Sequence, residues 1–271
     1  MKKFVTTLCL IVSLALGSLG KGWSADFQKG MEAYNNGDFA TALKEWKPLA
    51  EGGDTDAQYY LGIMYDEGQG VPQDYQAAAK WYTIVAEKGY PEAQRHLALL
   101  YYEGKGVPQN YQEVVKWMTL AANQGKAEAQ KNLGILYRDG EVVPQDYQIA
   151  EKWFELAATQ GDITSQINIG FLYYNGQGVP QDFQTAIKWF TLAAEQGSLQ
   201  GQHNIAYMYY NGQGVKIDKV YAHMWASIAS SNGFENSKVI LEALSKEMTP
   251  SQIQEAKRLT EECVKNNYKG C

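Results

Sequence analysis

The chain has 271 residues, of which 45% are hydrophobic and 20% charged, with 24 basic and 30 acidic side chains. This hydrophobic content is enough for a large buried core and excludes a largely disordered chain. The net charge of −6, with no run of Lys and Arg, argues against binding to nucleic acid or to anionic membrane.

The first 25 residues have the pattern of a secretory signal peptide. Lys2 and Lys3 precede an apolar run over residues 4–16, which is too short to span a bilayer as a helix of about 20 residues. Cleavage fits after Gly20 better than after Ala25, and the site stays open. We expect an exported protein, periplasmic or secreted, without stable membrane insertion after cleavage. The alternative is an uncleaved membrane anchor.

Loss of residues 1–25 would remove three lysines and no acidic residue. The remaining chain would have 21 basic and 30 acidic side chains and a net charge of −9. The next segment, residues 26–53, contains two short helical patterns separated by Gly37-Asp38-Phe39, and its second half places Ala42, Trp46 and Ala50 at intervals of four. We expect a helical hairpin there.

From residue 54 to residue 233 the sequence repeats every 36 residues. The interval is shown by five tryptophans: Trp81, Trp117, Trp153, Trp189 and Trp225. A fixed period of this length is typical of a helical solenoid, in which one helix pair is copied and stacked. Each copy reads as a first helix, a Gly-rich turn, a second helix and a closing glycine.

Within the first copy, Ala57, Leu61 and Tyr65 define the buried face of the first helix. The second helix is expected to bury Ala78, Trp81, Ile84 and Val85 on one face. The residues expected to cap the second helices are Asp74, Asn110, Asp146, Asp182 and Asp218. The third turn, Gly140-Glu141-Val142-Val143, departs from the pattern, and we expect a kink there.

These motifs resemble the Sel-one-like repeat (SLR) family, a relative of the tetratricopeptide repeat. The shared pattern is A-x-x-x-L-G-x-x-Y-x-x-G-x-G-V, an Asp, then A-x-x-W-x-x-x-A-A-x-x-G, in five copies over 54–233. Residues 26–53 look like a shorter, tetratricopeptide-like unit. The resemblance implies an all-α, α/α superhelical solenoid of about six helix-turn-helix repeats, whose first helices line the concave side. It also implies an adaptor in assemblies of the cell envelope or of host interaction.

Residues 234–271 are expected to form a C-terminal capping helix and tail. Thr249-Pro250-Ser251-Gln252 is a helix start with a capping box, and the helix should run to about Cys263. A terminal cap with a polar outer face keeps a solenoid soluble. In an exported protein Cys263 and Cys271 can form a disulfide that closes the tail, and two unpaired thiols are the alternative.

No pattern for catalysis, metal or cofactor binding emerges. His96, His203 and His223 are not at ligand spacing from Cys, Asp or Glu, and no nucleophile elbow, zinc-protease or Walker motif occurs. The Gly68-Gln69-Gly70 sequence follows a helix and recurs in other copies, so it is a turn rather than a phosphate loop. We therefore predict no enzyme, no cofactor and no metal.

Positions that vary between copies indicate a binding surface. On the first helices, the face opposite the buried one carries aromatic and cationic side chains, which are enriched at binding hot spots. The candidates are Tyr102, Arg138, Tyr174 and Tyr210, helped by Arg95 and Lys131. The positive charge of Arg95, Lys131 and Arg138 would favour an acidic or extended partner. The alternative is that they are ordinary exposed residues of an unused face.

Three functions remain open. The first is a non-catalytic scaffold, expected to be a monomer, that binds a protein or peptide of unidentified sequence along its concave face. The second is a β-lactam-binding or hydrolysing enzyme, as for cysteine-rich relatives, although those carry a disulfide in each repeat and this chain has no cysteine in any repeat. The third is a purely structural spacer.

Overall fold

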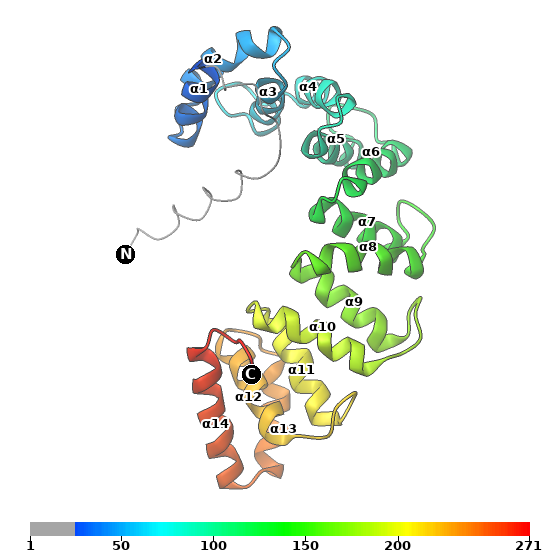
Figure 1. The fold of residues 1–271 in the computed structure, drawn as a ribbon, viewed down its shortest axis with the longest axis vertical. Helices are drawn as coiled ribbons and strands as arrows, with labels where there is room; N and C mark the ends of the chain where they lie inside the picture. The colour runs from blue at the N-terminus through cyan, green and yellow to red at the C-terminus, as the bar shows by residue number, and fades with distance from the viewer. Residues whose placement is uncertain (1–24) are drawn as a thin grey trace. The chain divides into compact units, whose positions relative to one another are not determined.

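The computed structural model describes residues 25–271, in which fourteen helices and no strand are found (Figure 1). The all-α prediction is thus confirmed. The predicted signal peptide lies outside the described residues, apart from Ala25. Among the helices that are described, none is long and apolar enough to cross a membrane. The helices are α1 (Ala25–Asn35), α2 (Phe39–Glu51), α3 (Thr55–Glu67), α4 (Tyr75–Glu87), α5 (Pro91–Glu103), α6 (Tyr111–Asn123), α7 (Ala127–Asp139), α8 (Tyr147–Thr159), α9 (Ile163–Asn175), α10 (Phe183–Glu195), α11 (Leu199–Asn211), α12 (Lys219–Ser231), α13 (Ser237–Glu247) and α14 (Pro250–Lys265).

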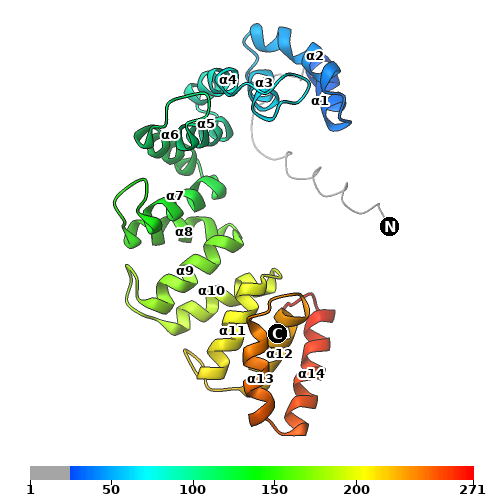
Figure 2. The same cartoon turned by 180° about the vertical axis from the view of Figure 1, so that it is seen from behind.

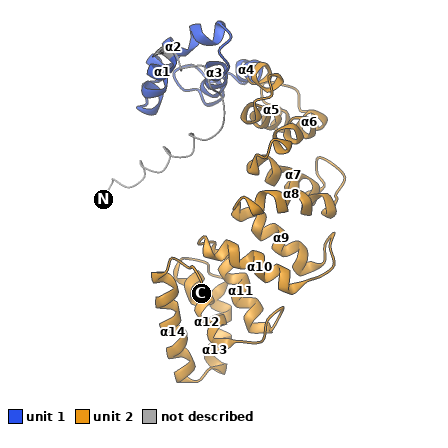
Figure 3. Cartoon of the chain, in the orientation of Figure 1, with its two compact units in different colours: residues 1–81 blue, residues 82–271 orange. Residues whose placement is uncertain are grey.

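The chain divides into two compact units, residues 1–81 and residues 82–271, with the boundary inside α4 (Figure 3). In the first unit α1 and α2 form the hairpin expected for residues 26–53. Trp46 is fully buried there, and its ring lies 4.7 Å from that of Tyr60. The Trp46 Nε1–H donates to the Phe27 carbonyl at 3.2 Å, which satisfies the one polar atom of the ring.

The second unit is built of helix hairpins that follow one another along the chain. In each hairpin a first helix (α5, α7, α9 or α11) packs against the second helix that follows it (α6, α8, α10 or α12). The expected caps are confirmed, because the Asn110, Asp146, Asp182 and Asp218 side chains each accept hydrogen bonds from two backbone N–H groups of the following helix. These bonds satisfy donors that a helix start otherwise leaves unpaired.

The recurring tryptophans are less central than the sequence indicated. Trp117 and Trp225 are buried, but Trp153 and Trp189 are only half-buried. The fully buried position is the next residue, which is Tyr82, Met118, Phe154 or Phe190. Trp189 packs against a core that contains Phe154 of the preceding repeat and Ile169 of its own repeat, so this tryptophan joins two repeats. Ile84, expected to be buried, is 39% exposed, because it lies beside the buried stripe rather than on it.

Glycine on the first helix allows an aromatic ring on the second to lie against its backbone. A Cβ placed on Gly134 would lie 2.5 Å from Phe154 Cδ1, and one on Gly170 would lie 2.5 Å from Phe190 Cε1. The equivalent position in the second repeat is Ala98, where the residue 20 positions later is the unbranched Met118. In two hairpins a glycine is thus matched with a large ring, and in another an alanine is matched with the slimmer Met118.

The third turn keeps the anchoring of the others despite its different sequence. Helix α7 ends at Gly140, which has φ = 74°, and the Asp146 N–H donates to the Tyr137 carbonyl at 2.8 Å. The same bond in the next repeat joins Asp182 N–H to the Tyr173 carbonyl at 2.9 Å. The expected kink does not shorten either helix, because both α7 and α8 have the same 13 residues as their counterparts.

Helices α13 and α14 form the C-terminal cap and both contact α12 (Figure 2). The capping box of Thr249 and Gln252 is present, and α14 continues to Lys265, two residues beyond the expected end. Met224 and Ile228 of α12 are buried. The equivalent residues in the preceding repeat are the exposed Lys188 and the 44% exposed Leu192, so the fifth repeat has an apolar surface that the cap covers.

A disulfide links Cys263 on α14 to Cys271 in the tail, with their Cα atoms 5.5 Å apart. Cys263 is buried in the core that α14 shares with α12, and Tyr268 packs against the same core. The tail also reaches the fourth repeat, where the Gly270 N–H donates to Glu195 Oε1 at 3.2 Å. The tail is thus held against the end of the array.

Candidate functional site

The surface formed by α5, α7, α9 and α11, called the first-helix surface below, carries most of the residues singled out in the sequence. Tyr102, Arg138, Tyr174 and Tyr210 occupy equivalent positions in the last turns of these four helices. Only Tyr102 is exposed, at 37%, and its ring lies 6.2 Å from that of Tyr111. The other three are half-buried. The four side chains therefore occupy the same position on their helices but differ in exposure and in the residues they contact.

Tyr174 and Tyr210 make hydrogen bonds to residues outside their own repeats. The Tyr174 hydroxyl donates to Gln213 Oε1, and the Tyr210 hydroxyl donates to Glu247 Oε1, both at 2.9 Å. The hydrogen bond to Glu247 raises the pKa of Tyr210. Since Glu247 belongs to α13, Tyr210 ties the last repeat to the cap. The Tyr210 hydroxyl is therefore already hydrogen-bonded within the chain, and the side chain is half-buried.

The candidate cations are each paired with an acidic side chain. Arg138 Nε lies 2.6 Å from Asp139 Oδ1, and Arg95 Nη1 lies 3.7 Å from Glu128 Oε1. Lys131 Nζ lies 3.8 Å from Asp162 Oδ2. The Arg95–Glu128 pair joins neighbouring repeats, and the Lys131–Asp162 pair joins α7 to the residue that caps the start of α9. This pairing offsets the positive charge that the sequence analysis expected to attract an acidic partner.

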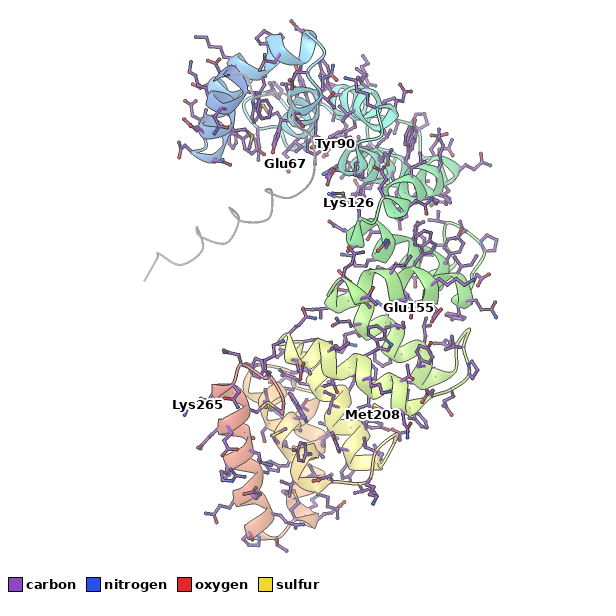
Figure 4. The ribbon with its side chains drawn as sticks, viewed as in Figure 1. Glu67, Tyr90, Lys126, Glu155, Met208 and Lys265 are labelled. Carbon is purple, nitrogen blue, oxygen red and sulfur yellow. A yellow bond between two sulfur atoms is a disulfide. The ribbon has the colours of Figure 1, made fainter. Side chains whose placement is uncertain are left out.

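Two pockets on the first-helix surface are equivalent to each other. The first has a volume of about 160 Å³ and the second about 230 Å³. The first is lined by Leu99, Tyr102, Val114, Met118, Asn132, Ile135 and Leu136. The second is lined by Phe171, Tyr174, Phe190, His203, Asn204, Tyr207 and Met208. Six of the positions that line the first pocket also line the second, two repeats or 72 residues later, and two of them keep the same residue type, Tyr and Asn. Met208 is labelled in Figure 4.

Arg138 occupies the equivalent place in the repeat between the two pockets. Its Nη1 donates to Asn168 Oδ1, and the Asn168 Nδ2 donates to the Thr164 carbonyl at 2.8 Å. A more polar hollow of about 450 Å³ lies beside this guanidinium and includes Ile167 and Gln200 in its lining. The first-helix surface thus has two apolar pockets with a cationic and amide group between them.

A glutamine relay between repeats was missed in the sequence analysis. The buried side chains of Gln94, Gln130, Gln166 and Gln202 each donate through Nε2 to the carbonyl of the alanine eight residues earlier, at the end of the preceding second helix. Gln124, Gln160 and Gln196 then donate through Nε2 to the Oε1 of Gln94, Gln130 and Gln166, at 2.7–2.9 Å. These contacts could have been predicted from the sequence, because Gln recurs every 36 residues on the buried face of the first helices.

The histidines are held within the packed helices. Burial is the main cause that lowers the pKa of His96 to about 4, and its ring stacks on Tyr82 at 5.0 Å. His203 Nδ1 lies 3.0 Å from Ser237 Oγ, and burial lowers its pKa as well. Within residues 25–271 no group of three His, Cys, Asp or Glu side chains is placed to hold a metal ion.

The stacked hairpins, the inter-repeat relay and the terminal cap define a helical repeat solenoid. The Sel1 repeat family model matches residues 55–90, 91–126, 127–162, 163–198 and 199–234, so the chain belongs to the Sel1 repeat family. Proteins with this fold are typically scaffolds for protein interaction and are generally non-catalytic. A search of curated proteins gave no match.

Two solved structures are similar over most of the chain. One is c5321, a protective antigen present in uropathogenic Escherichia coli strains that displays an SLR fold, with 34% identity and a TM-score of 0.77 over 88% of this chain. The match spans 53% of the c5321 chain, so the present chain corresponds to about half of that protein. The other is a Sel1 repeat protein from Oxalobacter formigenes, with 29% identity and a TM-score of 0.75, covering 87% of this chain and 98% of that one.

Proposed function

We propose that this protein is an exported, non-catalytic scaffold that binds a protein or peptide on its first-helix surface. The observation that carries the proposal is the recurrence of one apolar pocket, with a tyrosine at its edge, two repeats apart. Apolar pockets with a few polar groups at their margin are the usual sites of side-chain anchoring in protein interfaces. Repetition along the array would allow several modest contacts to add up in one partner.

The cellular location in this proposal is the periplasm or the exterior, because the first 25 residues have the pattern of a signal peptide. Its test is separate from the binding test. Mass spectrometry of the protein from the periplasmic fraction should show the loss of residues 1–20 or 1–25. A full-length protein found only in the cytoplasmic fraction would rule out export.

Binding is tested by capture from a cell-envelope extract with the purified chain and a Tyr102→Ala/Tyr174→Ala variant. Both substitutions enlarge the pockets at their rim, and circular dichroism should show an unchanged helical content. The matched control is Leu120→Ala/Leu156→Ala, because these leucines are exposed on the second helices, α6 and α8. We expect a partner that the wild type and the control retain and the tyrosine variant loses. Retention by all three would disprove binding on the first-helix surface.

A further inference from the structure

Asn204, which lines the second pocket, has a side-chain amide without a partner. Its Nδ2 is buried, and the Asn204 side chain makes no hydrogen bond to any other described residue. Buried amide donors are nearly always hydrogen-bonded in folded proteins, because leaving one unpaired is unfavourable. The exception here lies at the wall of an apolar pocket, where a ligand would provide the missing partner.

The amide of Asn204 can turn without losing a bond. A half-turn about χ2 exchanges the positions of Oδ1 and Nδ2, and no hydrogen bond within the described residues opposes it. The side chain can therefore present either an acceptor or a donor to the pocket. A peptide backbone offers both an N–H and a C=O, which makes it the natural complement of such an amide.

Asparagine recurs at this position in three successive first helices, as Asn132, Asn168 and Asn204. Asn132 lines the first pocket, and Asn204 lines the second. Asn168, between them, is held by Arg138 and by the Thr164 carbonyl. The two amides at the apolar pockets are thus available to a ligand, whereas Asn168, which lines the polar hollow beside Arg138, is engaged by the protein.

The spacing of the pockets sets the form of the ligand. The first helices α7 and α9 contact each other, and each pocket is lined by two successive first helices. Packed helices lie about 10 Å apart. Two repeats therefore separate the pockets by roughly 20 Å, which an extended chain spans with about six residues at roughly 3.3 Å each. A helical peptide would not suit the two amides, because its backbone groups are already paired internally.

We propose that the first-helix surface binds an extended peptide that places two bulky apolar side chains, about six residues apart, in the two pockets, while Asn132 and Asn204 hydrogen-bond its backbone. The proposal rests on the proposed function and names its ligand. Arg138 would lie opposite the middle of this peptide. The apolar anchors account for affinity, and the asparagine amides set the extended conformation.

The test begins with a library of phage-displayed random dodecapeptides selected on the purified chain. We expect enriched peptides to share two bulky apolar residues at a separation of six, within one residue. Enrichment of a helical pattern with spacings of three and four, of peptides without a fixed spacing, or of no peptide at all would overturn the proposal.

The second stage measures the affinity of one enriched peptide, labelled with fluorescein, by fluorescence anisotropy. In Asn204→Leu the side-chain volume is retained and no protein hydrogen bond is lost, so the variant should be as thermally stable as the wild type. We expect its affinity to fall at least tenfold. The matched control is Asn123→Leu, because Asn123 is an exposed asparagine at the end of the second helix α6 and lines neither pocket. It should change the affinity less than twofold.

The two proposals can fail separately. If Asn204→Leu binds the peptide as tightly as the wild type while Tyr102→Ala/Tyr174→Ala binds it weakly, the surface is correct and the role of the asparagines is wrong. If no peptide is enriched but envelope capture is lost in the tyrosine variant, scaffold function stands without an extended-peptide ligand. If neither experiment depends on this surface, both proposals are wrong.

Discussion

Gly134 and Phe154 show how one residue limits its neighbour within a hairpin. Alanine is a better helix former than glycine by about 0.5–1 kcal/mol, so Gly134→Ala would stabilise α7 if space allowed. The new Cβ would, however, lie 2.5 Å from the Phe154 ring, which is fully buried. Overpacking of this kind costs about 1–3 kcal/mol, so the steric effect should exceed the gain in helix propensity.

We therefore expect Gly134→Ala to lower the free energy of unfolding by about 1–2 kcal/mol, measured by urea denaturation. The second repeat contains the compatible pair Ala98 and Met118. The double variant Gly134→Ala/Phe154→Met should accordingly be more stable than Gly134→Ala alone. A Gly134→Ala variant as stable as the wild type would show that the ring can move away.

The glutamine relay is incomplete at its last step. Gln202 has a buried Oε1 without a hydrogen-bond donor among the described residues, and position 232, where the three preceding repeats have Gln, is Asn. The shorter Asn232 side chain donates instead to the Ile228 carbonyl at 2.9 Å. We expect Asn232→Gln to complete the relay and to raise stability by about 1 kcal/mol.

Thermal unfolding would measure that gain, and Gln196→Ala provides the opposite case. Gln196 Nε2 donates to Gln166 Oε1 at 2.9 Å, so its removal leaves a buried acceptor and should cost about 1–3 kcal/mol. A loss with Gln196→Ala but no gain with Asn232→Gln would mean that the side chain at 232 does not reach Gln202.

His96 should make stability depend on pH. Its pKa is about 4 in the folded chain, chiefly because of burial and then because of Arg95, whereas Glu92 acts in the opposite direction. An unfolded histidine has a pKa of about 6.5, so protonation favours the unfolded state. The contribution of neutral His96 is complete above about pH 6.5 and is lost as the pH falls toward about 4.

The control is His96→Asn, because later repeats have Asn at this position. Between pH 7 and pH 5 the wild type should lose about 2 kcal/mol more than the variant, measured by chemical denaturation at each pH. Acidic residues titrate in both proteins and cancel in the difference. Parallel pH profiles for the two proteins would show that His96 is protonated without unfolding.

At the scale of helices, α12 differs from the earlier second helices at the positions that the cap covers. Lys80, Lys116, Lys152 and Lys188 recur in the first four repeats, whereas the fifth has Met224, which is fully buried. Since an unpaired charge is very unfavourable in a core, Met224→Lys should destabilise the cap by about 3 kcal/mol or more. Hydrogen exchange should then show α14 opening before α8 and α10.

The matched control is Lys188→Met. Lys188 is exposed on α10, so this change should alter stability by no more than about 0.5 kcal/mol. Equal protection of α14 in Met224→Lys and in the wild type would mean that the new lysine reaches solvent along the edge of α14.

At the scale of the whole molecule, the signals that were local in sequence predicted the fold. The Asp and Asn caps and the Thr249 capping box each act within a few residues, and the 36-residue period shows how often such units recur. The helices follow both signals. The pockets could not be predicted in this way. They depend on side-chain contacts between repeats, such as the hydrogen bonds from Arg138 to Asn168 and from Tyr174 to Gln213. The repeat pattern of the sequence does not show these contacts.

The prediction of a monomer also belongs to this scale. Solenoids associate end to end when a terminal apolar face is left uncovered. Here α13 and α14 cover the fifth repeat, and the chain has a mass of 30.3 kDa including the expected signal peptide. Light scattering should give the mass of one chain over a wide concentration range, and a mass that rises with concentration would point to self-association.

The glutamine relay also bears on how an array of this kind can evolve. A repeat such as residues 127–162 receives the contact of the next glutamine at one end and supplies Gln130 at the other. Duplication or loss of a whole 36-residue cassette would preserve these contacts, whereas an insertion of any other length would break them. The last repeat is not interchangeable, because its α12 is adapted to the cap. Natural length variants should therefore differ by whole repeats inserted before α11.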